Sequence, residues 1–102
     1  MRYVSTRGSA PALDFEGVTL AGLASDGGLY VPAEWPCFSI DEIRALRGLS
    51  YPDLATRVMA PFVAGSLTED ELSAICHKVY GDFGHAAVAP LVQMDQQHWL
   101  LE

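Results

Sequence analysis

The residues most suited to chemistry in this chain of 102 residues are three histidines, two cysteines and a single lysine. His77, His85 and His98 lack the i, i+4 or short-loop spacing of metal ligands, and no carboxylate cluster completes a site around them. Cys37 and Cys76 form neither a CxxC motif nor a metal-binding spacing. We therefore expect no metal site, structural or solvated histidines, and two free thiols in a reducing cytoplasm.

A thiol, an imidazole and an amine follow one another at Cys76, His77 and Lys78. Neighbouring helix residues point about 100° apart, so the thiol and the imidazole do not face each other. Cys76 falls on an apolar stripe, which predicts a buried and inert thiol. Lys78 needs a desolvated pocket to form a Schiff base, whereas its position on an ordinary helix face predicts a solvated amine. We predict no catalytic, cofactor-binding or metal-binding residue in this chain.

Two short polar segments are the best candidates for direct contacts. Ser5-Thr6-Arg7-Gly8 offers hydroxyls and a guanidinium to a phosphate or a carboxylate, although polar residues at a strand end before a turn give the same pattern. Asp26-Gly27-Gly28 suits either a loop that another backbone approaches closely or a helix-exit turn with positive φ at one glycine. The candidate contacts to a substrate cleft or to another domain are Ser5, Thr6, Arg7, Asp26, Gly27 and Gly28.

The first third of the chain contains the elements that must position these segments. A strand is predicted from Arg2 to Thr6, followed by a turn over residues 8–11. Asp14 is a helix cap, and the helix is expected to run to about Ala24 despite Gly17. The Asp-Gly-Gly turn then leads into a short strand, residues 29–31, which Pro32 closes.

Three further helices have start signals. Ser39 with Glu42 is a capping box for a helix to about Arg47, and Thr68 with Glu71 is the clearest box, for a helix that ends at Gly81. Ser50 with Asp53 opens the helix between them, in which Pro61 either bends the end or terminates the helix at about Ala60. The expected apolar faces are Ile40, Ile43 and Leu46 in the first, Leu54, Val58 and Phe62 in the second, and Leu72, Ile75, Cys76, Val79 and Tyr80 in the third.

The tail predicts a β-hairpin with strands from Leu91 to Met94 and from His98 to Glu102 around a polar turn at residues 95–97. The last strand contains Trp99-Leu100-Leu101 and has no turn or polar segment after it. Because free apolar strand edges invite pairing, we interpret Glu102 as a point of truncation.

Composition and charge limit the function classes. The length fits a single domain spanning residues 1–102, and half of the residues are hydrophobic. A net charge of −7 with six scattered basic residues argues against nucleic acid and anionic membranes. No apolar run approaches the roughly 20 residues of a membrane helix. Apolar residues and glycine make up about 55% of the chain, above the usual 45–50%, which favours a surface that meets a partner.

The order of several blocks resembles the N-terminal domain of threonine synthase. The blocks are Tyr3-Val4-Ser5-Thr6-Arg7-Gly8, Ala10-Pro11, Phe15-Glu16, Leu20-Ala21-Gly22-Leu23-Ala24 and Asp26-Gly27-Gly28-Leu29-Tyr30-Val31-Pro32. The stretch from Ser50-Tyr51 to Leu72 is similar to the helical middle of that domain, and Pro90 to Glu102 resembles the segment that leads into the cofactor domain. Gly17 departs from the pattern, since a better helix former is usual there.

The resemblance implies a small α+β domain of a cytoplasmic, pyridoxal-phosphate-dependent lyase of threonine biosynthesis. That enzyme converts O-phospho-L-homoserine and water to L-threonine and phosphate. Its Schiff-base lysine lies in a Pro-Thr context that does not occur here, so the cofactor is expected on the parent enzyme and not on this chain. The implied partner is the cofactor domain, with weak self-association through the Trp99 to Glu102 edge. The alternative is a free-standing binding or interaction module of the same ancestry.

Overall fold

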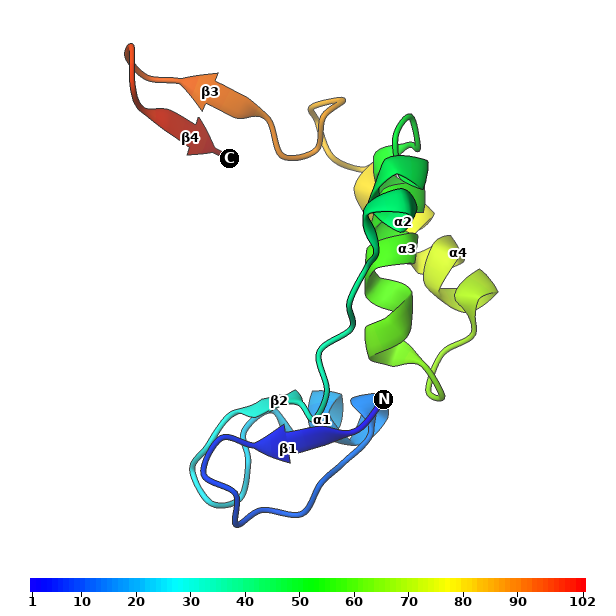
Figure 1. The fold of residues 1–102 in the computed structure, drawn as a ribbon, viewed down its shortest axis with the longest axis vertical. Coiled ribbons are helices and arrows are strands. Elements are labelled where there is room, and N and C mark those ends of the chain that lie inside the picture. Colours follow the sequence, from blue (N-terminus) through cyan, green and yellow to red (C-terminus); the bar gives the residue numbers. More distant parts are fainter.

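A computed structural model describes residues 1–102 as four helices and four short strands (Figure 1). The strands form two separate antiparallel sheets of two strands each. The predicted α+β class is therefore confirmed. In chain order the elements are β1 (Tyr3–Ser5), α1 (Phe15–Ala21), β2 (Tyr30–Pro32), α2 (Ile40–Ala45), α3 (Tyr51–Val63), α4 (Glu69–Gly81), β3 (Leu91–Gln93) and β4 (Trp99–Leu101).

The N-terminal lobe, residues 1–33, contains β1, α1 and β2. The two strands pair antiparallel with Val4 opposite Val31. Asp14 caps α1 as predicted, because its carboxylate accepts the N–H of Gly17 at 2.8 Å. The helix ends at Ala21 and not at about Ala24, since Gly22 takes a φ of 68° and turns the chain away. The second strand is shifted by one residue from the prediction and includes Pro32.

The three predicted start signals all begin helices. Both capping boxes form, with the side chains of Ser39 and Thr68 each accepting the backbone N–H three residues later. Ser50 caps α3 in the same way. Helix α3 continues through Pro61 to Val63, so termination at about Ala60 is wrong. Helix α2 ends two residues before Arg47.

The core lies where α3 packs against α4. Its buried residues are Val63, Leu72 and Cys76, and Cys76 is a free thiol, as predicted. The stripe predicted for α3 is wrong, since Val58 is 39% exposed whereas Thr56 is buried. Ala55 and Ala60 pack against the core instead, because small side chains let the two helices approach closely. Helix α2 buries none of its residues.

Two contacts join the N-terminal lobe to α3 and the residue that follows it. The Tyr3 hydroxyl donates to the carbonyl of Phe62 at 2.8 Å, and the amino terminus donates to the carbonyl of Ala64 at 2.6 Å. The Trp35 ring, on the segment between lobe and helices, meets Phe62 edge-on at 6.4 Å between centroids. These contacts hold the base of the helical pair beside the lobe.

The predicted hairpin is present as β3 and β4, with strands one residue shorter at the turn, and Leu91 lies opposite Leu101 and Gln93 opposite Trp99. Figure 1 shows it projecting from the helices and far from the N-terminal lobe. The radius of gyration is 16.7 Å, against about 13 Å for a compact domain of this length. Only 8 of the 102 residues are buried, so most of the apolar side chains face outward. None of the helices has the length and apolar character that crossing a membrane requires.

Candidate functional site

The candidate contact residues all lie together where β1 ends and β2 begins. Asp26 is their centre: its Oδ1 accepts from the Ser5 hydroxyl at 2.7 Å and from the Gly28 N–H at 3.0 Å. Its Oδ2 accepts the N–H groups of Ser9 and Ala10, both at 2.9 Å. The hydrogen bond from Ser5, with those from the backbone amides, lowers the pKa of Asp26 to about 2 although partial burial opposes this. We call this arrangement the Asp26 cluster.

Side chains from the end of β1 and from the two residues after it approach the two glycines closely. Gly27 has a φ of 77°, as predicted for one of the pair, and a Cβ there would lie 2.8 Å from Arg7 Nη1. Gly28 is buried, and a Cβ on it would overlap the Ser5 hydroxyl. Both interpretations of the Asp-Gly-Gly segment need correction. Helix α1 already ends at Ala21, so the segment is a separate turn before β2, and the groups that approach its glycines are side chains and not another backbone.

Most hydrogen-bonding groups of the Ser5 to Arg7 segment point into the cluster. The Ser5 hydroxyl accepts the N–H of Arg7 at 3.1 Å, and Thr6 Oγ1 accepts the N–H of Leu29 at 3.0 Å. Arg7 Nη1 donates to the carbonyl of Asp26 at 3.0 Å. A carboxylate at the centre repels an added phosphate or carboxylate, so the geometry favours a structural lock over an anion pocket. Thr6 and Arg7 are exposed at the rim.

Five residues donate hydrogen bonds to Asp26, and the sequence singled out three of them, Ser5, Arg7 and Gly28, but not Ser9 and Ala10. An Asp before a glycine pair is typical of an Asx-turn, in which the carboxylate binds the backbone two residues later, and this signal accounts for the Gly28 amide. No local signal pointed to the amides of Ser9 and Ala10, because amides of an exposed turn can bond to water. Their approach to Asp26 depends on the pairing of β1 with β2.

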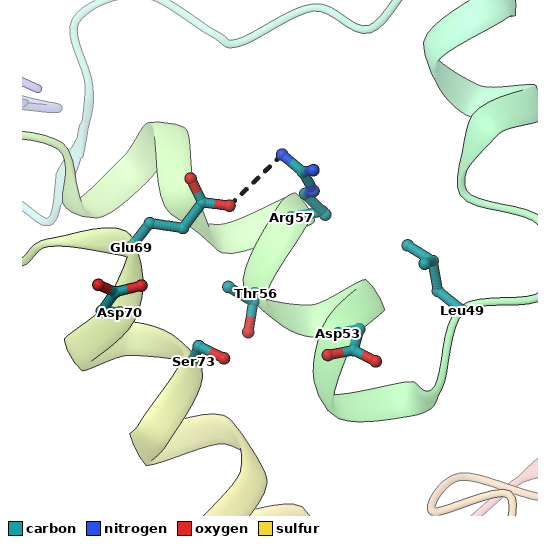
Figure 2. A pocket seen from close by; sticks show the side chains of 7 residues that line it. All are labelled: Leu49, Asp53, Thr56, Arg57, Glu69, Asp70 and Ser73. Atoms are coloured by element: carbon teal, nitrogen blue, oxygen red, sulfur yellow. Dashed lines mark ion pairs between the residues drawn. The ribbon is translucent and has the colours of Figure 1, made fainter.

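A polar hollow lies between α3 and α4 (Figure 2). Arg57 Nη1 and Glu69 Oε1 reach across it to 3.4 Å, and His77 Nε2 lies 3.4 Å from Asp53 Oδ1 beside it. Every member of these pairs is about half exposed, and the pairs link the helices without enclosing a ligand. The lining residues are Leu49, Asp53, Thr56, Arg57, Glu69, Asp70 and Ser73.

The remaining candidate chemical groups are dispersed. No three His, Cys, Asp or Glu side chains gather as a metal site would require. His85 accepts the N–H of Ala87 at 3.0 Å, and His98 lies 2.8 Å from the carboxylate of Asp95. Lys78 is exposed in the last turn of α4, as predicted.

Comparison with known proteins agrees with this architecture. The sequence profile described as "Threonine synthase N terminus" matches residues 2–80. The chain belongs to this family. Threonine synthase of Pseudomonas aeruginosa is 58% identical over 102 residues, which are 100% of this chain and 22% of that protein. Threonine synthase of Schizosaccharomyces pombe is 38% identical over 90 residues, 87% of this chain and 18% of that protein.

Solved structures have the same fold. Threonine synthase of Brucella melitensis, in its pyridoxal-phosphate-bound form, superposes with a TM-score of 0.91 at 50% identity and covers 100% of this chain. The Escherichia coli enzyme gives 0.83 at 19% identity, again over the whole chain. This chain accounts for 22% and 23% of those structures. It therefore spans about one fifth of the relatives that it matches.

The residues present do not fit pyridoxal phosphate. The cofactor needs a lysine in a desolvated pocket, whereas the single lysine here is solvent-exposed and does not line the hollow between α3 and α4. The Asp26 cluster has a carboxylate where the cofactor phosphate would need donors. The groups that hold the cofactor in a relative must come from its other four fifths.

Proposed function

We propose that this chain is the N-terminal part of a pyridoxal-phosphate-dependent threonine synthase, a lyase that converts O-phospho-L-homoserine and water to L-threonine and phosphate. The observation that carries the proposal is 58% identity over all 102 residues to a threonine synthase, with the same arrangement in the Brucella enzyme. The free thiols of Cys37 and Cys76 support a cytoplasmic location for the whole protein.

The proposed role of the segment is structural, and by itself it is inactive. No side chain in it combines an activating partner with a closed pocket, which a nucleophile or a general base requires. The Asp26 cluster fixes the backbone at the end of β1, and the exposed side chains of Thr6 and Arg7 project from this fixed backbone. We propose that these two side chains contact the substrate cleft or the cofactor domain, while Ser5, Asp26, Gly27 and Gly28 hold them in place.

A chimera tests the proposal. Residues 1–102 are joined to the part of Pseudomonas aeruginosa threonine synthase that follows its matching segment, and phosphate release from O-phospho-L-homoserine is measured with pyridoxal phosphate. We expect activity within tenfold of the intact Pseudomonas enzyme, and none from residues 1–102 alone or from the Pseudomonas remainder alone. A folded chimera without activity would contradict the proposed function.

A separate measurement tests the proposal that residues 1–102 are inactive by themselves. Pyridoxal phosphate is titrated into residues 1–102 while the visible absorbance is followed, with Lys78→Ala as the matched control. We expect no saturable band in either protein. A band that disappears in Lys78→Ala would show that the segment binds the cofactor by itself.

A further inference from the structure

The β3–β4 hairpin has apolar side chains on both faces. Residues directly opposite in an antiparallel pair share a face, so Leu91, Trp99 and Leu101 lie on one face together with Gln93, and Val92 and Leu100 lie on the other. All five apolar side chains are exposed in this chain, by between 40% and 65%. An antiparallel sheet with one solvated face shows a polar face, whereas strands covered on both faces do not. The pattern is that of a hairpin covered on both sides.

The position of the hairpin is not held by this chain. The extensive contacts between elements are those of α3 with α4, of β1 with β2 and of β3 with β4, so the hairpin has extensive contacts only within itself. The segment before it, residues 82–90, contains turns and includes Val88 at a φ of 61°, which is unfavourable for a β-branched residue. Nothing local therefore fixes where the hairpin lies.

The same position nevertheless recurs in longer proteins. The Brucella structure superposes over 100% of this chain, hairpin included, and the Escherichia coli structure does so with 19% sequence identity. A two-stranded hairpin is marginally stable in water by itself. An arrangement that recurs without internal contacts must be held by the remaining four fifths of those proteins.

We propose that the β3–β4 hairpin is inserted into the remaining polypeptide of the full-length protein, which covers both of its faces and pairs with at least one of its free edges. The occupant of this surface is that polypeptide and not a second copy of the chain. A second copy docked on one face would leave the other apolar face in water. The inference rests on the proposed function for the identity of the polypeptide and adds how the segment is anchored in it.

Hydrogen exchange on the chimera described above tests the insertion. In residues 1–102 alone, amides of residues 91–101 should exchange within about tenfold of the rate of an unstructured peptide. In the chimera we expect exchange at least 100-fold slower. Equal rates in the two proteins would overturn the proposal. The measurement does not depend on turnover, so an inactive chimera with a protected hairpin contradicts the proposed function and supports the insertion.

Two adjacent substitutions test whether both faces are covered. Leu100→Asp places a carboxylate on one face of β4, and Leu101→Asp places one on the other face. Gln96→Asp in the turn is the control. Both leucine variants should lower the Tm of the chimera by about 5 °C or more, or prevent folding, and the control by less than about 2 °C. A lower Tm for only one leucine variant would mean that only one face is covered and that the hairpin lies on the surface. A dimeric chimera that either variant dissociates would assign the covering to a second copy. Either result would overturn the insertion.

Discussion

At the scale of residues, the Asp26 cluster is the main finding. Two polar segments 20 residues apart, each ambiguous by itself, become a single hydrogen-bonded unit. The sequence predicted the two segments of this unit and one positive φ at the glycine pair, but not the amides of Ser9 and Ala10. It could not predict that the Ser5 hydroxyl donates to Asp26, because that depends on the pairing of β1 with β2. The donors that suggested an anion site are the same donors that satisfy the carboxylate.

Gly28→Ala should destabilise the chain by about 1–3 kcal/mol, because its Cβ would overlap the Ser5 hydroxyl in a buried position. Gly81→Ala is the matched control. Nothing lies within 4 Å of a Cβ there, and the residue is in the last turn of α4, so the change should be neutral or stabilising by up to about 1 kcal/mol. Urea unfolding of the two variants decides. Equal effects would show that the glycine at position 28 is not needed for close packing.

The acid stability of the N-terminal lobe should depend on Asp26. Its folded-state pKa of about 2 lies below the usual value, so the ionised form stabilises the folded state above about pH 4. That contribution is lost as the pH falls from about 4 to about 2. Asp26→Asn should lower the Tm at pH 7 and flatten the change in Tm over this interval. Thermal melts from pH 7 to pH 2 measure it, and the same acid slope in both proteins would contradict the role of Asp26.

At the scale of elements, local signals determined the helix starts and tertiary packing determined the buried faces. Ser39, Ser50 and Thr68 were predictable because an N-cap acts on amides three residues away. The buried face of α3 was not predictable from hydrophobicity, since the side that meets α4 carries Ala55 and Thr56 and leaves Val58 half exposed. When a helix has apolar residues on two sides, its sequence does not tell which side is buried.

Because α4 packs against α3 with one side only, substitutions at two positions of α4 should differ sharply in their effect on stability. Leu72 is buried in the core, whereas Ile75 is 49% exposed on the same helix. Leu72→Ala should cost about 2–5 kcal/mol, and Ile75→Ala less than about 1 kcal/mol. Denaturant unfolding monitored by circular dichroism measures both. Comparable losses would mean that α4 is rotated from the orientation described above.

At the scale of the whole molecule, exposed apolar surface is the dominant property. The sequence predicted a surplus of apolar residues and an unprotected last strand, and the structure shows both, with the hairpin away from the core. Neither the extended outline nor the place of the hairpin could be predicted, because local sequence signals do not determine how separate elements are placed and few elements of this chain contact one another extensively. That residues 1–102 act as one domain remains a prediction.

The chain alone should self-associate weakly, with the edge from Trp99 to Glu102 at or near the contact. Apolar burial contributes about 25 cal/mol per Å² and is not screened by salt, whereas the repulsion from a net charge of −7 is screened within about 8–10 Å. Association should therefore strengthen as salt is raised. Sedimentation over a concentration series at low and high salt, with Trp99→Asp as the comparison, tests this. A strict monomer under every condition would refute it.

The hairpin with two apolar faces also remains uncovered for part of its biosynthesis. If the proposed full-length protein has the length of the Pseudomonas relative, of which the 102 matching residues are 22%, roughly 360 residues remain to be translated when the hairpin is complete. At about 5–20 residues per second this takes roughly 20–70 s. During that interval, both apolar faces and both strand edges emerge from the ribosome before the polypeptide that covers them exists. We expect a nascent chain arrested at this point to bind a chaperone that recognises apolar segments, through residues 91–101.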